Sequence, residues 1–164
     1  MRYGHIGLSK RVNMKISFFV SDEGYGHVMR QKNIISLLLS LSPSIDITIF
    51  TKSKIDLFHR QFENSVDYVE LFNLVQTAKD SSGNLDLVTT REFFEMWTSS
   101  VDLWLESAEK HLPSSTCLLV SDSVPQVTML GKKLNIPVMF VQHFTWDWLY
   151  HELFGEDRIF QQLN

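Results

Sequence analysis

Short apolar runs alternate with segments of helical periodicity along most of this 164-residue chain, and this alternation limits the possible folds more than any other feature. Each apolar run ends in a polar turn. This pattern is typical of strands whose two faces are both buried in a sheet. The expected strands are Ile16–Val20, Ile45–Phe50, Val66–Leu71, Cys117–Val120 and Pro137–Val141. Strands joined by helices run parallel with right-handed crossovers. The sequence therefore predicts an α/β domain with a Rossmann-like, doubly wound parallel sheet.

The helices are expected between and after these strands. They are His27–Leu41, Lys54–Phe62, a long helix that Pro113 ends, Val124–Leu134 and much of Thr145–Asn164. The long helix has an apolar stripe with steps of four, four, three and four residues, which predicts core packing. The stripe consists of Phe93, Trp97, Val101, Trp104 and Ala108. We expect Ser53 to cap the second helix, and the polar stretch Asn73–Thr89 to be a surface loop.

Composition narrows the function classes. The net charge of −4 and the absence of a Lys/Arg cluster argue against a nucleic-acid partner, and no apolar stretch approaches the roughly 20 residues that span a bilayer. Cys117 is the single cysteine, so no internal disulfide forms, and we expect it to be a buried apolar residue in a cytoplasmic protein. No Cys/His set has zinc-ligand spacing, so no metal is expected. Residues 1–13 are expected to be an extension without a function, and residues 14–164 the domain.

The first candidate site is the turn after the first expected strand. Gly24 and Gly26 permit a tight backbone and a close approach by a ligand. His27 falls at a helix start, where the helix dipole disfavours a protonated ring and suits a general base. A capping histidine on a structural turn, or a glycine loop that binds phosphate, fits the same spacing. Met29 stands where the dinucleotide fingerprint has its third glycine, and no P-loop is present.

The second candidate is Asp122, which follows the fourth expected strand. Because ligands bind beyond the carboxyl ends of parallel strands, Asp122 is expected near His27. Its carboxylate either caps the next helix, with Pro125 in the first turn, or holds the second imidazole nitrogen as in catalytic triads. The two roles are compatible.

The third candidate is the aromatic-rich segment around Trp146 and Asp147. Aromatic rings beside a buried acid suit stacking on a sugar ring and hydrogen bonding to its hydroxyls. The same residues also suit plain packing of a terminal helix. We interpret His143 and His151, which flank the segment, as surface or structurally satisfied histidines.

Several segments together resemble a glycosyltransferase-like family whose first loop reads roughly Gly-His-Gly-x-Gly-His-x-x-Arg, an opening shared with the N-terminal region of plant arabinose kinases. Lys15–Arg30 is similar to that opening, and Val120–Pro125 and Asn135–Pro137 follow in the family's order. Phe144–Tyr150 resembles the family's Phe-Ser-Trp-Asp-Phe-Ile-Tyr element. Asp22–Glu23 departs from the pattern, because the family has Gly-His there.

The resemblance implies the N-terminal, acceptor-binding half of a two-domain glycosyltransferase of the GT-B type. His27 would be the base that takes the proton of the acceptor hydroxyl, with inversion at the anomeric carbon, and Asp122 would orient it. The residues implied in substrate binding are Gly24, Tyr25, Gly26, Arg30, Trp146 and Asp147. Such sites normally need no metal or other cofactor, because protein dipoles and cationic groups stabilise the leaving diphosphate.

A nucleotide-sugar donor would be bound by a C-terminal half that this sequence does not contain. We therefore expect the chain to be a fragment or a subunit of a split enzyme, inactive alone, that acts on a sugar or glycolipid acceptor. The alternatives are a non-catalytic nucleotide- or sugar-binding module, and an interaction subunit whose sheet edge or last helix docks a partner.

Overall fold

Five parallel strands form the sheet of the computed structural model, which describes residues 14–73 and 75–155. The strand order is β3-β2-β1-β4-β5, with every neighbouring pair parallel. The strands are β1 (Lys15–Val20), β2 (Asp46–Phe50), β3 (Asp67–Val69), β4 (Thr116–Asp122) and β5 (Val138–Phe140). This order confirms the predicted Rossmann-like, doubly wound α/β fold. The residues 1–13, for which an extension was expected, and the tail beyond residue 155 lie outside the described residues.

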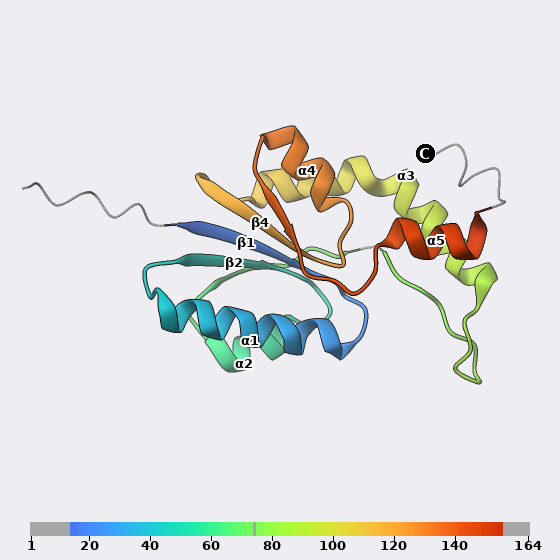
Figure 1. Cartoon of the computed structure of the whole chain (residues 1–164), viewed down its shortest axis with the longest axis horizontal. Helices are drawn as coiled ribbons and strands as arrows, with labels where there is room; N and C mark the ends of the chain where they lie inside the picture. The colour runs from blue at the N-terminus through green and yellow to red at the C-terminus, as the bar shows by residue number, and fades with distance from the viewer. Residues whose placement is uncertain (1–13, 74, 156–164) are drawn as a thin grey trace, which may run out of the picture.

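Helices cover both faces of the sheet (Figure 1). They are α1 (Tyr25–Leu41), α2 (Ile55–Phe62), α3 (Leu87–His111), α4 (Val127–Leu134) and α5 (Trp146–Phe154). Figure 1 shows α1 and α2 on one face and α3 and α4 on the other, while α5 lies at the end of the domain toward which the strands run. No helix within the described ranges is long and apolar enough to cross a membrane.

The core forms because the side chains of each strand alternate between the two faces. Phe18 of β1 is buried against the α1 and α2 side, whereas its neighbour Phe19 belongs to the opposite cluster. Phe19 stacks on Phe50 of β2 with ring centroids 4.4 Å apart, and Trp104 of α3 packs against it at 5.6 Å. Apolar residues on both faces explain why β1 reads as a continuous apolar run.

A third, smaller cluster lies beside the sheet, and it corrects two expectations. It joins Val75, Phe94, Trp146 and Tyr150. The segment that precedes α3 is therefore not simply a surface loop, because Val75 is only 2% exposed. On α3 the buried residue of this region is Phe94 at 5% exposure, whereas Phe93 is half-buried, because the helix here faces α5 rather than the sheet.

Two further expectations are wrong. Cys117 is exposed rather than buried, because it lies beside an irregularity in the β1–β4 register between Lys15 and Ile16, where the alternation of faces is interrupted. Its thiol donates to the Lys15 carbonyl at 3.2 Å. Ser53 does not cap α2; Lys54 precedes that helix without a side-chain cap, and the Ser53 hydroxyl binds Asp22 instead.

Candidate functional site

The turn between β1 and α1 is open at the carboxyl end of the sheet. Gly24 has φ 62° and ψ 165°, a conformation that essentially only glycine adopts. A Cβ atom built on Gly24 or Gly26 would meet no other atom within 4 Å, so the space beside the turn is free. Tyr25 is 70% exposed, and its ring centroid lies 5.5 Å from the Lys54 ammonium. The turn therefore presents backbone and one aromatic ring to the solvent.

His27 and Asp122 meet at this end of the domain. His27 is the third residue of α1, and Asp122 is the last residue of β4, which pairs with β1. The imidazole Nδ1 lies 2.7 Å from Oδ1 of Asp122. A contact this short with a carboxylate requires Nδ1 to carry a hydrogen, so in the neutral ring the lone pair is on Nε2. The side chain of His27 keeps 22% of its surface exposed, whereas Asp122 is fully buried.

Two more side chains of α1 hold the same carboxylate. The Arg30 guanidinium donates to both oxygens of Asp122, at 2.5 Å to Oδ1 and 3.2 Å to Oδ2. The Gln31 amide donates to Oδ2 at 2.6 Å. Arg30, predicted as a substrate contact, is thus engaged within the protein. Gln31 was not singled out from the sequence, although its position one helical turn after His27 would have placed it on the same face.

The electrostatics of Asp122 follow from these contacts. Burial alone raises the pKa of the carboxyl, but hydrogen bonds from His27, Arg30 and Gln31 outweigh it, and the resulting pKa lies below the ordinary value. Asp122 is therefore a carboxylate throughout the neutral range. It does not cap the following helix: α4 begins only at Val127, and Ser121 rather than Asp122 accepts from the Val124 amide. Of the two roles considered for Asp122, the structure shows the contact with the imidazole.

Asp22, where the resembling family has glycine, ties three loops together. Its Oδ1 accepts from the Thr51 hydroxyl and from the backbone N–H and hydroxyl of Ser53. Its Oδ2 accepts from the backbone N–H of Asn73 at 2.7 Å. Glu23 beside it accepts from the Thr77 hydroxyl at 2.6 Å. Both carboxylates are occupied by loops of this chain, so the outer part of the turn has a structural role.

The aromatic segment divides into a buried part and an exposed part. Trp146 is 3% exposed and donates from its indole nitrogen to the Ser123 carbonyl at 2.8 Å. Of the two predictions for this residue, stacking on a sugar or packing of the last helix, the structure thus shows packing. Asp147 is exposed, so the expectation of a buried acid is wrong. It lies in the first turn of α5, a position where the helix dipole favours an acid. Phe144 and Trp148 are 42% and 53% exposed, and their ring centroids lie 6.4 Å apart.

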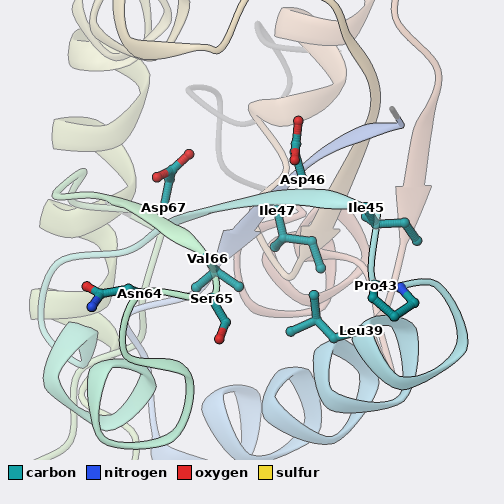
Figure 2. Close-up of a pocket in the computed structure, with 9 residues that line it drawn as sticks. All are labelled: Leu39, Pro43, Ile45, Asp46, Ile47, Asn64, Ser65, Val66 and Asp67. Atoms are coloured by element: carbon teal, nitrogen blue, oxygen red, sulfur yellow. The ribbon is translucent and has the colours of Figure 1, made fainter. Parts of the chain in front are cut away.

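A hollow of about 530 Å³ lies far from this site, at the amino ends of the strands (Figure 2). Leu39, Ile47 and Val66 give it an apolar wall, and Figure 2 shows Asp46 and Asp67 pointing away from that wall. No group of three or more His, Cys, Asp or Glu side chains that could hold a metal ion occurs among the residues described.

Comparison with family models finds no match, and neither does comparison with curated protein sequences. Solved structures do match. The glycosyltransferase of kitacinnamycin aligns with a TM-score of 0.60 and 14% identity over 92% of this chain and 36% of its own. A UDP-glucose: anthocyanidin 3-O-glucosyltransferase in complex with UDP aligns with a TM-score of 0.57 and 16% identity. That alignment covers 90% of this chain and 33% of the other. A UDP-glucosyltransferase from Polygonum tinctorium capable of glucosylating indoxyl aligns with a TM-score of 0.51 and 17% identity. That alignment covers 92% of this chain and 34% of the other.

These alignments show the fold. The chain has the architecture of one Rossmann-like half of a GT-B glycosyltransferase, and it spans about a third of the length of the structures that it matches.

Proposed function

We propose that this chain is the acceptor-binding half of an inverting, nucleotide-sugar-dependent glycosyltransferase, with His27 as the general base. The observation that carries the proposal is the 2.7 Å contact between Nδ1 of His27 and Oδ1 of Asp122 beside an open glycine turn. The likeness to one half of GT-B glycosyltransferases supports it. The pair stands where ligands bind in a parallel α/β sheet, beyond the carboxyl ends of the strands.

In the proposed reaction, Nε2 of His27 accepts the proton of an acceptor hydroxyl. The oxygen then forms a bond to the anomeric carbon of the donor sugar, while the bond from that carbon to the nucleoside diphosphate breaks. Attack from the side opposite the leaving group inverts the configuration. Asp122 fixes the tautomer and stabilises the imidazolium that forms, as the carboxylate of a triad does. The proton leaves Nε2 to solvent after the product departs.

Exposed aromatic rings in the β1–α1 turn and in the segment after β5 suit an acceptor. Tyr25, Phe144 and Trp148 are all exposed, and aromatic faces stack on sugar rings and on other flat apolar groups. We assign the stacking role to Phe144 and Trp148 in place of Trp146, whose indole is buried and hydrogen-bonded. The backbone of Gly24 and Gly26 would lie close to the acceptor, because no side chain occupies that space.

The donor belongs, in this proposal, to a second Rossmann-like half on a separate or adjoining polypeptide. The chain spans about a third of the solved structures that it matches, so most of their length has no counterpart here. We expect no transferase activity from this chain alone.

Ligand binding by this chain alone tests the assignment of the acceptor side. Thermal-shift measurements and the ring signals of His27 in NMR spectra would be recorded with candidate acceptors, with UDP and with UDP-glucose. The proposal expects acceptors to perturb the His27 signals and nucleotides to bind weakly or not at all. Tight nucleotide binding with no response of His27 to any acceptor would contradict it.

A nucleotide- or phosphate-binding module is the second candidate, and one observation favours it. The first turn of α1 has no side-chain cap and no acidic residue, so its amide groups are available to an anion. In that case UDP would stabilise the chain, and His27→Ala would leave its affinity unchanged.

An interaction subunit is the third candidate. β5 is an edge of the sheet, and Met139 and Phe140 on it are 53% and 44% exposed. An exposed apolar edge strand is a surface on which another polypeptide can pair. Co-purification of a second Rossmann-like chain, lost when Phe140→Lys is introduced, would support this role and would also identify the donor half.

A further inference from the structure

The guanidinium of Arg30 lies against both members of the His27–Asp122 pair. Its Nη2 atom is 2.5 Å from Oδ1 of Asp122 and 3.2 Å from Nδ1 of His27. Oδ1 is also the oxygen that His27 contacts at 2.7 Å. His27 and the permanently charged Arg30 therefore share one carboxylate oxygen, to which the Ser123 hydroxyl also donates at 3.5 Å. Because Nδ1 carries a hydrogen toward Asp122, its approach to Arg30 is a contact between two donors and not a hydrogen bond.

This arrangement changes what the carboxylate does to the imidazole. A buried carboxylate beside a histidine favours the charged imidazolium, since opposite charges attract strongly where water is excluded. An imidazolium has no lone pair and cannot accept a proton from a substrate. The guanidinium of arginine is always charged in proteins, so the charge of Arg30 balances that of Asp122. It also repels a second positive charge on the ring that it contacts.

We propose that Arg30 is a positioning residue that keeps His27 unprotonated at neutral pH by neutralising Asp122 and occupying part of Oδ1. Gln31 assists by holding the other oxygen, at 2.6 Å, so the carboxylate cannot rotate away from the ring. The meaning of this device for catalysis rests on the proposed function, whereas its effect on the ionisation of His27 does not.

The other charged groups at this end of the domain are bound by other residues or are exposed. Asp22 is bound by Thr51, Ser53 and Asn73, and Glu23 is bound by Thr77. Lys54 donates to the Asp22 carbonyl at 2.7 Å, and the exposed His143 and Asp147 belong to the segment after β5. Arg30 is thus the cation in direct contact with the pair among the residues described.

The experiment is an NMR titration of the His27 ring in the isolated chain, which needs neither donor nor acceptor. The chain has six histidines, so the His27 signals are assigned from a His27→Gln variant. We expect Arg30→Gln to raise the pH midpoint of His27 protonation by about one unit or more, a roughly tenfold increase in the ratio of imidazolium to neutral imidazole at a given pH. Arg30→Lys keeps the charge and should stay nearer to the wild type.

A double variant separates a change in charge from a general disturbance. Arg30→Gln with Asp122→Asn removes both charges, so the midpoint should return toward that of the wild type. Amide spectra of each variant establish that the fold is retained, and the His111 midpoint serves as an internal reference because His111 lies at the end of α3. An unchanged or lowered midpoint in folded Arg30→Gln would overturn the proposal, as would an equal rise in Arg30→Lys.

The outcomes also distinguish this inference from the proposed function. A raised midpoint in Arg30→Gln together with full transferase activity of a reconstituted His27→Ala enzyme would keep the role of Arg30 and refute the base assignment. An unchanged midpoint in Arg30→Gln together with an inactive His27→Ala enzyme would refute the role of Arg30 and keep the base assignment of His27.

Discussion

The Nδ1 atom of His27 lies 2.7 Å from Oδ1 of Asp122, and this contact joins the first turn of α1 to the carboxyl end of β4 across 95 residues of sequence. Asp122 is fully buried while His27 remains partly exposed. The pair therefore has one partner fixed in the protein interior and one that a ligand can reach.

His27→Ala is expected to lower kcat of a reconstituted enzyme by about 100-fold or more, the usual contribution of a general base. The expected loss arises because no other group would take the proton of the acceptor hydroxyl. Steady-state kinetics with the donor half present measures it. His111→Ala is the matched control, since His111 is exposed at the far end of α3 and should leave kcat unchanged. A His27→Ala enzyme with the rate of the wild type would refute the base assignment.

Asp122→Asn is expected to lower the free energy of unfolding at pH 7 by about 2–4 kcal/mol, because it removes a buried charge that three side chains hold. The pKa of Asp122 is lowered in the folded chain, so the carboxylate stabilises the fold above its unfolded value near 3.8. That contribution is lost as the pH falls through the folded value. Urea denaturation should thus show that the difference in free energy of unfolding between the wild type and Asp122→Asn decreases below about pH 4. A difference that stays constant down to pH 2 would contradict the linkage.

Asp22→Ala is expected to destabilise the chain by about 2–4 kcal/mol, because several buried donors lose their acceptor at once. They come from the β2–α2 loop and from Asn73, so the variant frees two loops. Asp46→Ala is the control, since Asp46 is exposed at the start of β2. Equal denaturation midpoints for the two variants would show that the hydrogen bonds of Asp22 add nothing to stability.

Gly131→Ala is expected to destabilise α4 although alanine is the better helix former. A Cβ atom there would lie 2.3 Å from Val138 Cγ2 and 2.8 Å from the Ile136 carbonyl oxygen, so the helix and β5 must separate. Overpacking of this kind costs about 1–3 kcal/mol, more than the roughly 1 kcal/mol that alanine gains in helix propensity. Gly26→Ala is the matched substitution, because Gly26 is also helical but lies in open space, and it should leave the unfolding midpoint unchanged or raise it. If Gly131→Ala proves as stable as Gly26→Ala, the close packing of α4 on β5 is not present in solution.

The elements could be predicted from the chain because their signals are local. The apolar run of β1 and the helical spacing in α1 each reflect a preference that neighbouring residues decide. Element boundaries were predicted less closely: α4 starts three residues later than expected, because residues 125 and 126 form a turn before it. Burial was predicted less well. Cys117 lies exposed beside a register irregularity, and Trp146 turned inward onto Ser123.

The sequence by itself determined the alternation of strands and helices, and hence a parallel sheet with its polar turns at one edge. It also supplied the members of the site, since His27 and Asp122 each follow a strand. Only the tertiary structure decided how they combine. Helical and strand periods are local, whereas the distance between Nδ1 and Oδ1 depends on how α1 packs against the strands across the register of β1 and β4. That packing also set Arg30 on the carboxylate rather than toward a substrate.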